Sequence, residues 1–231
     1  MTAVLRPHPL VLAAQALLPA GCAVAGGPIA LWDGPLFPQE EEAMARAVPR
    51  RRAEFAAGRR AARAALGALG LPPLPLPRRA EGPPLWPPGV TGSITHGGGH
   101  VLAAVCSPDR AVALGLDLEP LLPLDEALRP AIAAPAEGGD LLRLFCAKEA
   151  AGKAQFALSG RVLGLGDLRV TLTEGGFEAC FAISVPPFAT GERIAGGQAA
   201  IGGFLVSAVA LAGVRNAAFL PSPLATAAAA P

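Results

Sequence analysis

The sequence predicts an α+β fold, and three of its features carry that prediction. Segments of strand type and of helix type are mixed along the chain without strict alternation, which favours α+β over a doubly wound parallel sheet. The chain has 231 residues, of which 52% are hydrophobic and only 16% charged, so it can bury a sizeable core and is not a disordered chain. Its 28 glycines and 25 prolines are spread along the chain, which indicates many turns and short elements.

Eight regular segments are expected in order along the chain. Two of them have helical periodicity, 50–69, which ends at Gly70, and 140–158, which Asp140 caps after two glycines. The others are apolar runs of strand length: 29–32, 100–106, 111–119, 168–172, 177–185 and 204–211. A proline-rich linker over 71–88 is expected to be extended, and the tail 225–231 is expected to fray.

Charge and cysteine content exclude several classes of protein. Nineteen basic against eighteen acidic residues give a net charge of +1, so no overall field draws the chain to nucleic acid or to an anionic membrane. Any anion site must therefore be local. The cysteines are far apart in sequence and lack zinc-ligand spacing, so we expect neither a metal cluster nor a redox pair: Cys22, Cys106, Cys146 and Cys180.

Two apolar segments have the length of an export signal or of a membrane span. The run 10–22 follows a lone Arg6 and is interrupted by Gln15 and Pro19, so an export signal is not expected. The run 194–214 is uncharged and long enough to span a bilayer, but four glycines fall in its first ten positions. Its apolar remainder has strand length, so we expect a core strand and a cytoplasmic protein with no stable membrane association. A membrane-associated protein is the alternative.

Two carboxylates share one face of the strand predicted at 111–119. With a period of two, Asp117 and Glu119 project to the same side, about 7 Å apart at their Cα atoms. Like charges at this spacing repel unless a cation or protons intervene, and a hard divalent ion such as Mg²⁺ prefers oxygen ligands. The alternative is a solvated strand end. The opposite face is apolar and carries Val112, Leu114, Leu116 and Leu118.

A third carboxylate interrupts the apolar stripe of the helix predicted at 140–158. Glu149 falls between Phe145 and Phe156 on the same face, and Lys153 lies one turn after it. An ordinary Glu149–Lys153 pair would contribute a few tenths of a kcal/mol. The functional alternative is a third metal-directed carboxylate beside a lysine aimed at the same anion. Gly152 costs about 1 kcal/mol of helix propensity, which indicates close packing at that position.

Two further features indicate an anion site. The segment 92–100 reads as a glycine-rich turn that offers hydroxyls, backbone N–H groups and His96 to phosphate oxygens, although it does not match a P-loop. Between 46 and 63 the chain carries seven arginines and one acid, Glu54. Arg52 and Arg59 fall on one helix face, which fits a compact polyanion such as a phosphorylated cofactor, while a solvated basic face is the alternative.

Together these stretches resemble the 4′-phosphopantetheinyl transferases of the Sfp type, in particular the branch of the enterobactin-synthase component D. The resemblance covers positions 36–153 and follows the family's order. The matching stretches are LFPQE at 36–40, RAEFAAGR at 52–59, WPPG and GSITH within 86–96, GLDLE at 115–119 and LFCAKEAAGK at 144–153.

The resemblance implies a monomer of two similar α+β halves, 1–110 and 111–231, related by a pseudo-twofold axis with coenzyme A between them. It implies transfer of the 4′-phosphopantetheine group to a serine of an apo acyl, peptidyl or aryl carrier domain, with release of 3′,5′-ADP, in siderophore or secondary metabolite biosynthesis. The implied Mg²⁺ ligands are Asp117, Glu119 and Glu149, with Glu149 also the base. The implied phosphate contacts are Lys153, Thr95, His96, Arg52, Arg59 and Arg79.

The sequence departs from the family pattern at a few positions. Gly152 stands where the family usually has a larger residue before the lysine, and Leu116 and Leu118 replace commoner isoleucines. A weakened member that binds coenzyme A or carrier domains without efficient transfer is therefore the alternative function. The presence of Asp117, Glu119, Glu149 and Lys153 argues against it.

Overall fold

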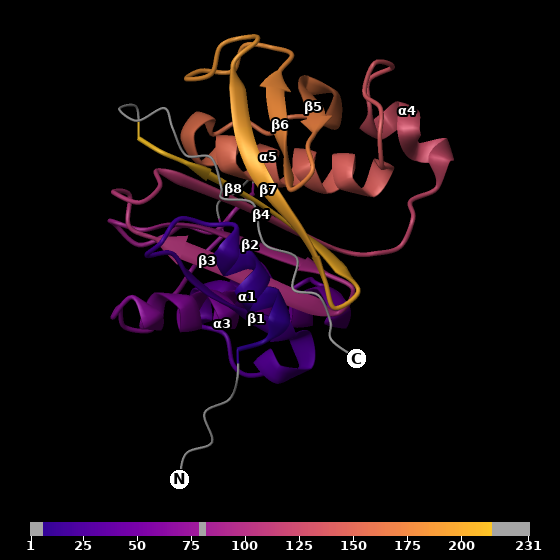
Figure 1. The fold of residues 1–231 in the computed structure, drawn as a ribbon. Helices are drawn as coiled ribbons and strands as arrows, with labels where there is room; N and C mark the ends of the chain where they lie inside the picture. The colour runs from indigo at the N-terminus through magenta and orange to yellow at the C-terminus, as the bar shows by residue number, and fades with distance from the viewer. Residues whose placement is uncertain (1–6, 79–81, 214–231) are drawn as a thin grey trace, which may run out of the picture.

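The computed structural model describes residues 7–78 and 82–213, which form two antiparallel sheets and their covering helices (Figure 1). The first sheet has three strands in the order β1-β3-β2, and the second has five in the order β4-β8-β7-β6-β5. This arrangement confirms the predicted mixture of helices with antiparallel sheets.

The strands are β1 (Ala23–Pro28), β2 (Thr91–Gly97), β3 (His100–Cys106), β4 (Ala113–Pro120), β5 (Leu168–Leu172), β6 (Gly176–Phe181), β7 (Arg193–Ile201) and β8 (Phe204–Leu211). The helices are α1 (Pro9–Ala16), α2 (Pro38–Ala43), α3 (Pro49–Ala68), α4 (Arg129–Ile132) and α5 (Leu141–Ser159), with three short 3₁₀ turns. Both long helices and the strands at 100–106, 168–172 and 204–211 lie where the sequence predicts them.

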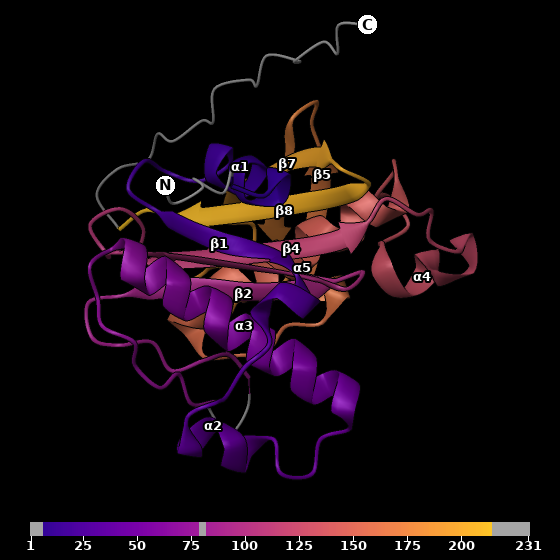
Figure 2. The same cartoon turned by 90° about the horizontal axis from the view of Figure 1, so that it is seen from below.

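In the first half, α3 lies across the three-stranded sheet, as Figure 2 shows. Alternate residues of β3 serve two cores because successive side chains of a strand point to opposite faces. Val101, Ala103 and Val105 pack with the alanines of α3, whereas Leu102 and Ala104 pack with α1, β4 and β8. The first sheet is therefore buried on both faces and joins the two halves.

In the second half, α5 lies directly on β4. A Cβ atom at Gly115 would come within 1.9 Å of the carbonyl oxygen of Ala150, so only glycine permits this approach of strand to helix. Asp140 caps α5 by accepting a hydrogen bond from the Arg143 amide at 2.8 Å, as the sequence predicts. The close packing places the middle of α5 beside the carboxylate face of β4.

The two sheets meet where β2 runs beside β4. The amide of Leu116 donates to the Ser93 hydroxyl at 3.0 Å, and a Cβ atom at Gly97 would lie 2.1 Å from the Leu118 carbonyl oxygen. The segment 92–97 and the segment 115–119, separated by some twenty residues in sequence, are thereby brought side by side.

Several expectations about elements are wrong. Residues 29–32 form a 3₁₀ turn rather than a strand, because they follow Pro28 at the end of β1. The segment 92–97 is strand β2, and only Gly98 and Gly99 make the turn, both with positive φ. The strand expected over 177–185 ends at Phe181.

The two apolar segments considered as an export signal and a membrane span form helix and strand elements of the fold. The run 10–22 includes α1, whose Leu10 and Ala14 are buried in the core between the halves. The run 194–214 contains most of β7 and all of β8. Among the described residues, no helix is both long and apolar enough to cross a bilayer. The tail 225–231 lies outside the described residues.

Candidate functional site

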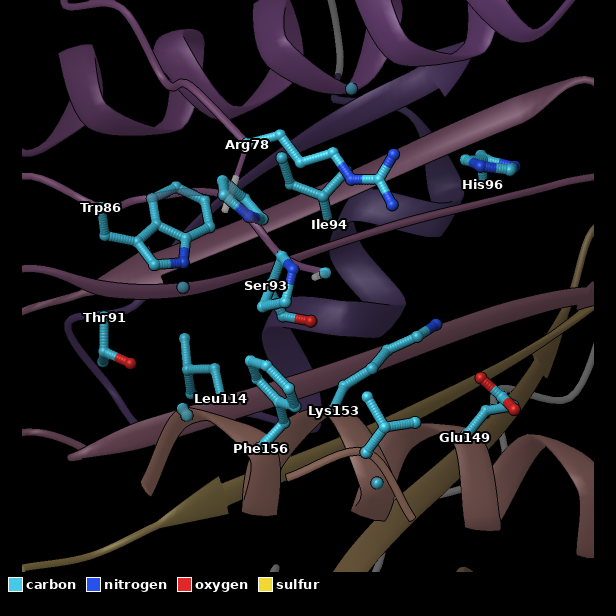
Figure 3. Close-up of a pocket in the computed structure, with 18 of the residues that line it drawn as sticks. Arg78, Trp86, Thr91, Ser93, Ile94, His96, Leu114, Glu149, Lys153 and Phe156 are labelled. Carbon is cyan, nitrogen blue, oxygen red and sulfur yellow. The ribbon is translucent and has the colours of Figure 1, made fainter. Parts of the chain in front are cut away.

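A cavity of about 620 Å³ lies between the two halves. Its walls come from α3, the segment 82–90, β2, β4, α5 and the loop 162–168. In Figure 3, Trp86, Leu114 and Phe156 lie toward one end of this cavity, while His96 and Glu149 lie toward the other. The cavity therefore has an apolar end and a polar end, with the side chains of Arg78 and Lys153 between them.

Three of the predicted site residues contact one another: Lys153, which lines the cavity, and Asp117 and Thr95, which are not among its lining residues. The Lys153 ammonium donates to Asp117 Oδ1 at 2.6 Å, to the Leu116 carbonyl at 3.0 Å and to Thr95 Oγ1 at 3.3 Å. Asp117 is only 3% exposed, so the alternative of a solvated strand end is wrong for this residue. Its second oxygen, Oδ2, is buried and has no hydrogen-bond partner among the described residues.

The expected pair between Glu149 and Lys153 is replaced by this contact. Lysine reaches across from α5 to β4, and no ion pair of Glu149 is found within 7–78 and 82–213. Glu149 instead lines the cavity. The acid in the apolar stripe is thus a cavity residue, and its role as a metal-directed carboxylate stays a prediction.

The carboxylates of Asp117, Glu119 and Glu149 influence one another. Burial, followed by the charge of Asp117, raises the pKa of Glu119 to about 7. Burial raises the pKa of Glu149, Lys153 lowers it, and Asp117 raises it further. Crowded acids of this kind favour protons or a cation.

These carboxylates fit a hard divalent cation in donor chemistry, because all offer oxygen and one buried oxygen lacks a partner. They are not closed around such an ion: among the described residues, no three His, Cys, Asp or Glu side chains converge closely enough to hold a metal. Lys153 occupies Asp117 instead. Movement of side chains would be needed to complete a cation site.

His96 lies on the cavity wall and is held by two residues of α3. Arg51 Nη1 lies 2.7 Å from His96 Nε2, and because arginine only donates, Nε2 accepts and the ring proton resides on Nδ1. That nitrogen faces Glu54 Oε2 at 3.9 Å. Burial lowers the pKa of His96, so the imidazole is neutral at pH 7.

The predicted arginines have different surroundings. Arg59 lines the cavity, donates from Nε to the Leu76 carbonyl at 2.7 Å and stacks its guanidinium 4.1 Å from the centroid of the Phe55 ring. Burial lowers the pKa of Arg59 to about 10, which leaves it cationic at pH 7. Arg52 pairs with Glu41 of α2 and does not line the cavity. Arg79 lies outside the described residues.

Sequence reasoning missed two arginines of the cavity wall, Arg51 and Arg78. Each is the immediate neighbour of an arginine that was singled out. The arginine run was a valid signal, but it did not fix which members face the cavity.

Sequence reasoning also missed the buried support of this wall. Glu40, the last residue of the LFPQE stretch, is fully buried. It accepts hydrogen bonds from Arg63 at 2.7 Å, from the Leu76 amide at 2.8 Å and from the Phe37 amide at 3.0 Å. Glu40 thereby fixes the segment before Arg78 against α3.

The expectation that a neighbour packs closely against Gly152 is wrong. A Cβ atom at this position would meet nothing within 4 Å, and the residue lines the cavity. The missing side chain therefore leaves open space beside Lys153 rather than admitting a packed neighbour.

Comparison with known proteins shows the family of the chain. Residues 39–106 match the model of the 4′-phosphopantetheinyl transferase N-terminal domain. The chain is 42% identical over 196 residues to the 4′-phosphopantetheinyl transferase Svp of Streptomyces mobaraensis, which covers 77% of this chain and 79% of that protein. The chain belongs to the 4′-phosphopantetheinyl transferase family.

Two other 4′-phosphopantetheinyl transferases are similar to it over a shorter region. PptT of Mycobacterium tuberculosis is 41% identical over 146 residues, and Npt of Nocardia iowensis is 38% identical over 144 residues. Each match covers 58% of this chain and 64% or 65% of the relative, so just under two thirds of these relatives is spanned. The narrower assignment to the enterobactin-synthase branch stays a prediction.

Proposed function

We propose that this protein transfers the 4′-phosphopantetheine group of coenzyme A to a serine hydroxyl of an apo acyl, peptidyl or aryl carrier domain and releases 3′,5′-ADP. The observation that carries the proposal is the contact of Lys153 with Asp117 and Thr95, because Lys153 lines the same cavity as Arg51, Arg59 and Arg78. Three relatives named as such transferases support it.

The cavity suits coenzyme A in size and in polarity. Its volume of about 620 Å³ lies within the range of small-molecule sites. The phosphates would lie against Arg51, Arg59 and Arg78, because guanidinium groups donate to phosphate oxygens, and His96 would lie beside Arg51 on the same wall. The pantetheine arm would lie toward Trp86 and Phe156. Contacts from Arg52 and Arg79 stay predictions.

Asp117, Glu119 and Glu149 would hold Mg²⁺. The unpartnered Oδ2 of Asp117 and the raised pKa values of Glu119 and Glu149 support this, since a cation relieves both the orphaned oxygen and the crowding of charge. When bound, Mg²⁺ neutralises charge on the diphosphate during phosphoryl transfer.

The chain's own residues would carry the proton and the leaving-group charge. The serine oxygen attacks the β-phosphorus of coenzyme A, and the bond from that phosphorus to the bridging oxygen breaks. Glu149 takes the serine proton, and its raised pKa suits a general base. The electron pair leaves on the α-phosphate of 3′,5′-ADP, whose negative charge Lys153 stabilises as it develops.

The wider context is also proposed. The boundary between the halves lies between residues 110 and 111, where the chain passes from the first sheet to β4. One long helix on an antiparallel sheet in each half supports an approximate twofold relation. We place the protein in the cytoplasm as a monomer that meets coenzyme A and carrier domains of siderophore or secondary metabolite synthesis there.

The role of Asp117 can be tested with a matched pair of variants. Asp117→Asn should lower transfer at least about 100-fold in the presence of Mg²⁺, because one anionic ligand is removed while size and hydrogen bonding are retained. Asp109→Asn removes an exposed acid and should leave transfer unchanged. Excess chelator should abolish transfer by the unaltered protein. Normal turnover of Asp117→Asn, or of the chelated protein, would show that the carboxylate cluster is not the metal site.

A further inference from the structure

Every N–H donor of the Lys153 ammonium has an acceptor in the free protein. Lysine has three N–H donors, and here three acceptors take them: the Asp117 carboxylate, the Leu116 carbonyl and the Thr95 hydroxyl. The Lys153 side chain is 32% exposed, so it sits at the cavity wall with its charge turned onto β4. In this position the ammonium is hydrogen-bonded to Oδ1 of Asp117.

This position conflicts with both ligands of the proposed reaction. A phosphate in the cavity can be contacted by Lys153 only after the ammonium gives up at least part of its bonds to Asp117. A cation bound at the unpartnered Oδ2 of Asp117 would share the carboxylate with the Lys153 ammonium on Oδ1, and because the two positive charges repel, cation binding is stronger once the ammonium has left. One movement of one side chain therefore satisfies both requirements.

The surroundings confine the movement to the lysine side chain and leave room for it. The backbone of α5 is fixed on β4, because the Ala150 carbonyl lies against Gly115. Gly152, the residue before the lysine, places no side chain in the cavity, and nothing lies within 4 Å of where its Cβ would be. The space next to Lys153 is open on the cavity side.

We propose that Lys153 is a positioning switch that couples coenzyme A binding to metal binding. In the free protein it neutralises Asp117 and weakens cation binding to that carboxylate. The diphosphate of coenzyme A draws the ammonium into the cavity and frees Asp117. The inference rests on the proposed function for the identity of the anion, but the blocking of Asp117 by Lys153 does not depend on it.

Lysine-selective isotope labelling tests the movement without any substitution. Lys148 and Lys153 are the only two lysines of the chain, and the Lys148 side chain is fully buried in an ion pair with Glu137. Adding coenzyme A in the presence of chelator should shift the side-chain NMR signal of Lys153 much more than that of Lys148, whose ammonium stays bonded to Glu137 and Leu165. An unchanged Lys153 signal while calorimetry shows coenzyme A bound would overturn the switch. Failure of coenzyme A to bind would instead overturn the proposed function.

Metal affinity in the absence of coenzyme A tests the blocking of Asp117. By calorimetry, Lys153→Met should bind Mg²⁺ about tenfold or more tightly than the unaltered protein, a coupling within the usual range. Lys153→Arg keeps the positive charge and should stay weak. Arg51→Met loses a charge elsewhere on the cavity wall and should change Mg²⁺ affinity less than about threefold, as expected for a screened charge.

Equal or weaker Mg²⁺ binding by Lys153→Met, with a melting temperature near that of the unaltered protein, would overturn the proposal. If Lys153→Met does not fold, the NMR experiment on the unaltered protein decides. The metal experiment needs no coenzyme A, so its result stands whether or not the proposed transfer is correct.

Discussion

Arg51 and Arg52 are neighbours in the chain but have different partners. Arg51 lines the cavity beside His96, whereas Arg52 pairs with Glu41 on α2. Because a hydrogen bond to a charged group contributes about 1.5–3 kcal/mol, Arg51→Ala should weaken coenzyme A binding about tenfold or more. Isothermal titration calorimetry with Arg51→Ala and Arg52→Ala compares the two positions directly.

The same titrations with 3′-dephospho-coenzyme A identify the phosphate that each arginine contacts. A contact to the 3′-phosphate predicts a loss with coenzyme A only, and a contact to the diphosphate predicts equal losses with both ligands. If Arg52→Ala loses more affinity than Arg51→Ala, the arginine predicted from sequence is the contact and the placement of the phosphates against Arg51 is wrong.

At the residue scale, the sequence predicted the types of side chain better than their directions. Period-two alternation is rigid, so Asp117 was correctly placed on the face of β4 opposite the leucines. A helix turns about 100° per residue, so a run of seven arginines did not determine that Arg51 rather than Arg52 faces the cavity. The contact of Lys153 with Asp117 joins two elements far apart in sequence, and only the fold supplies it.

At the scale of elements, two helical glycines of the cavity wall provide a matched comparison. A Cβ atom at Gly152 meets nothing within 4 Å, whereas at Gly58 it would lie 2.9 Å from Ile94 Cγ2. Gly152→Ala should therefore raise the free energy of unfolding by about 1 kcal/mol through helix propensity. The free energy of unfolding of Gly58→Ala should be about 1–3 kcal/mol lower than that of Gly152→Ala, because the added methyl group overpacks the helix against β2. Urea denaturation measures both, and equal effects would contradict the open space beside Lys153.

Lys148 of α5 is hydrogen-bonded to the cavity loop at 162–168 and forms a buried ion pair with Glu137, which lies outside that loop. Lys148 Nζ donates to Glu137 Oε2 at 2.8 Å and to the Leu165 carbonyl at 2.9 Å, and the lysine side chain has no exposed area. Lys148→Met should lower the free energy of unfolding by about 3–5 kcal/mol, because the Glu137 charge is left buried without a partner. Adding Glu137→Gln should recover part of this loss. If denaturant titration shows that Lys148→Met loses less than about 1 kcal/mol of unfolding free energy, the buried pair does not stabilise this part of the fold.

Elements with strong periodicity were predicted, and elements without it were not. Both long helices carry apolar stripes and clear ends, and β3 and β8 are rich in valine and other apolar residues. β1 and β2 consist largely of Ala, Gly, Ser and Thr, whose own preference for strands is weak or mixed. Both become strands because they pair with β3 from its two sides.

At the scale of the whole molecule, the function depends on how the two halves meet. The arginines and His96 come from the first half, and the carboxylates and Lys153 come from the second. The contact of β2 with β4 brings the two sets together, and Glu149 and Lys153 share one cavity with the arginines and His96. In the proposed function, neither half alone provides both the residues for the phosphates and those for the cation, so we expect transfer to require the assembled chain.

Intact-mass spectrometry of a carrier domain tests the central claim most directly. The purified protein is incubated with coenzyme A, Mg²⁺ and a panel of apo acyl, peptidyl and aryl carrier domains, with Asp117→Asn as the parallel control. We expect at least one carrier domain to gain the mass of one phosphopantetheine group on its serine, with release of an equal amount of 3′,5′-ADP, and we expect neither from the control. Unmodified carrier domains throughout the panel, while the protein binds coenzyme A, would contradict transfer and support the alternative of a binding protein without efficient catalysis.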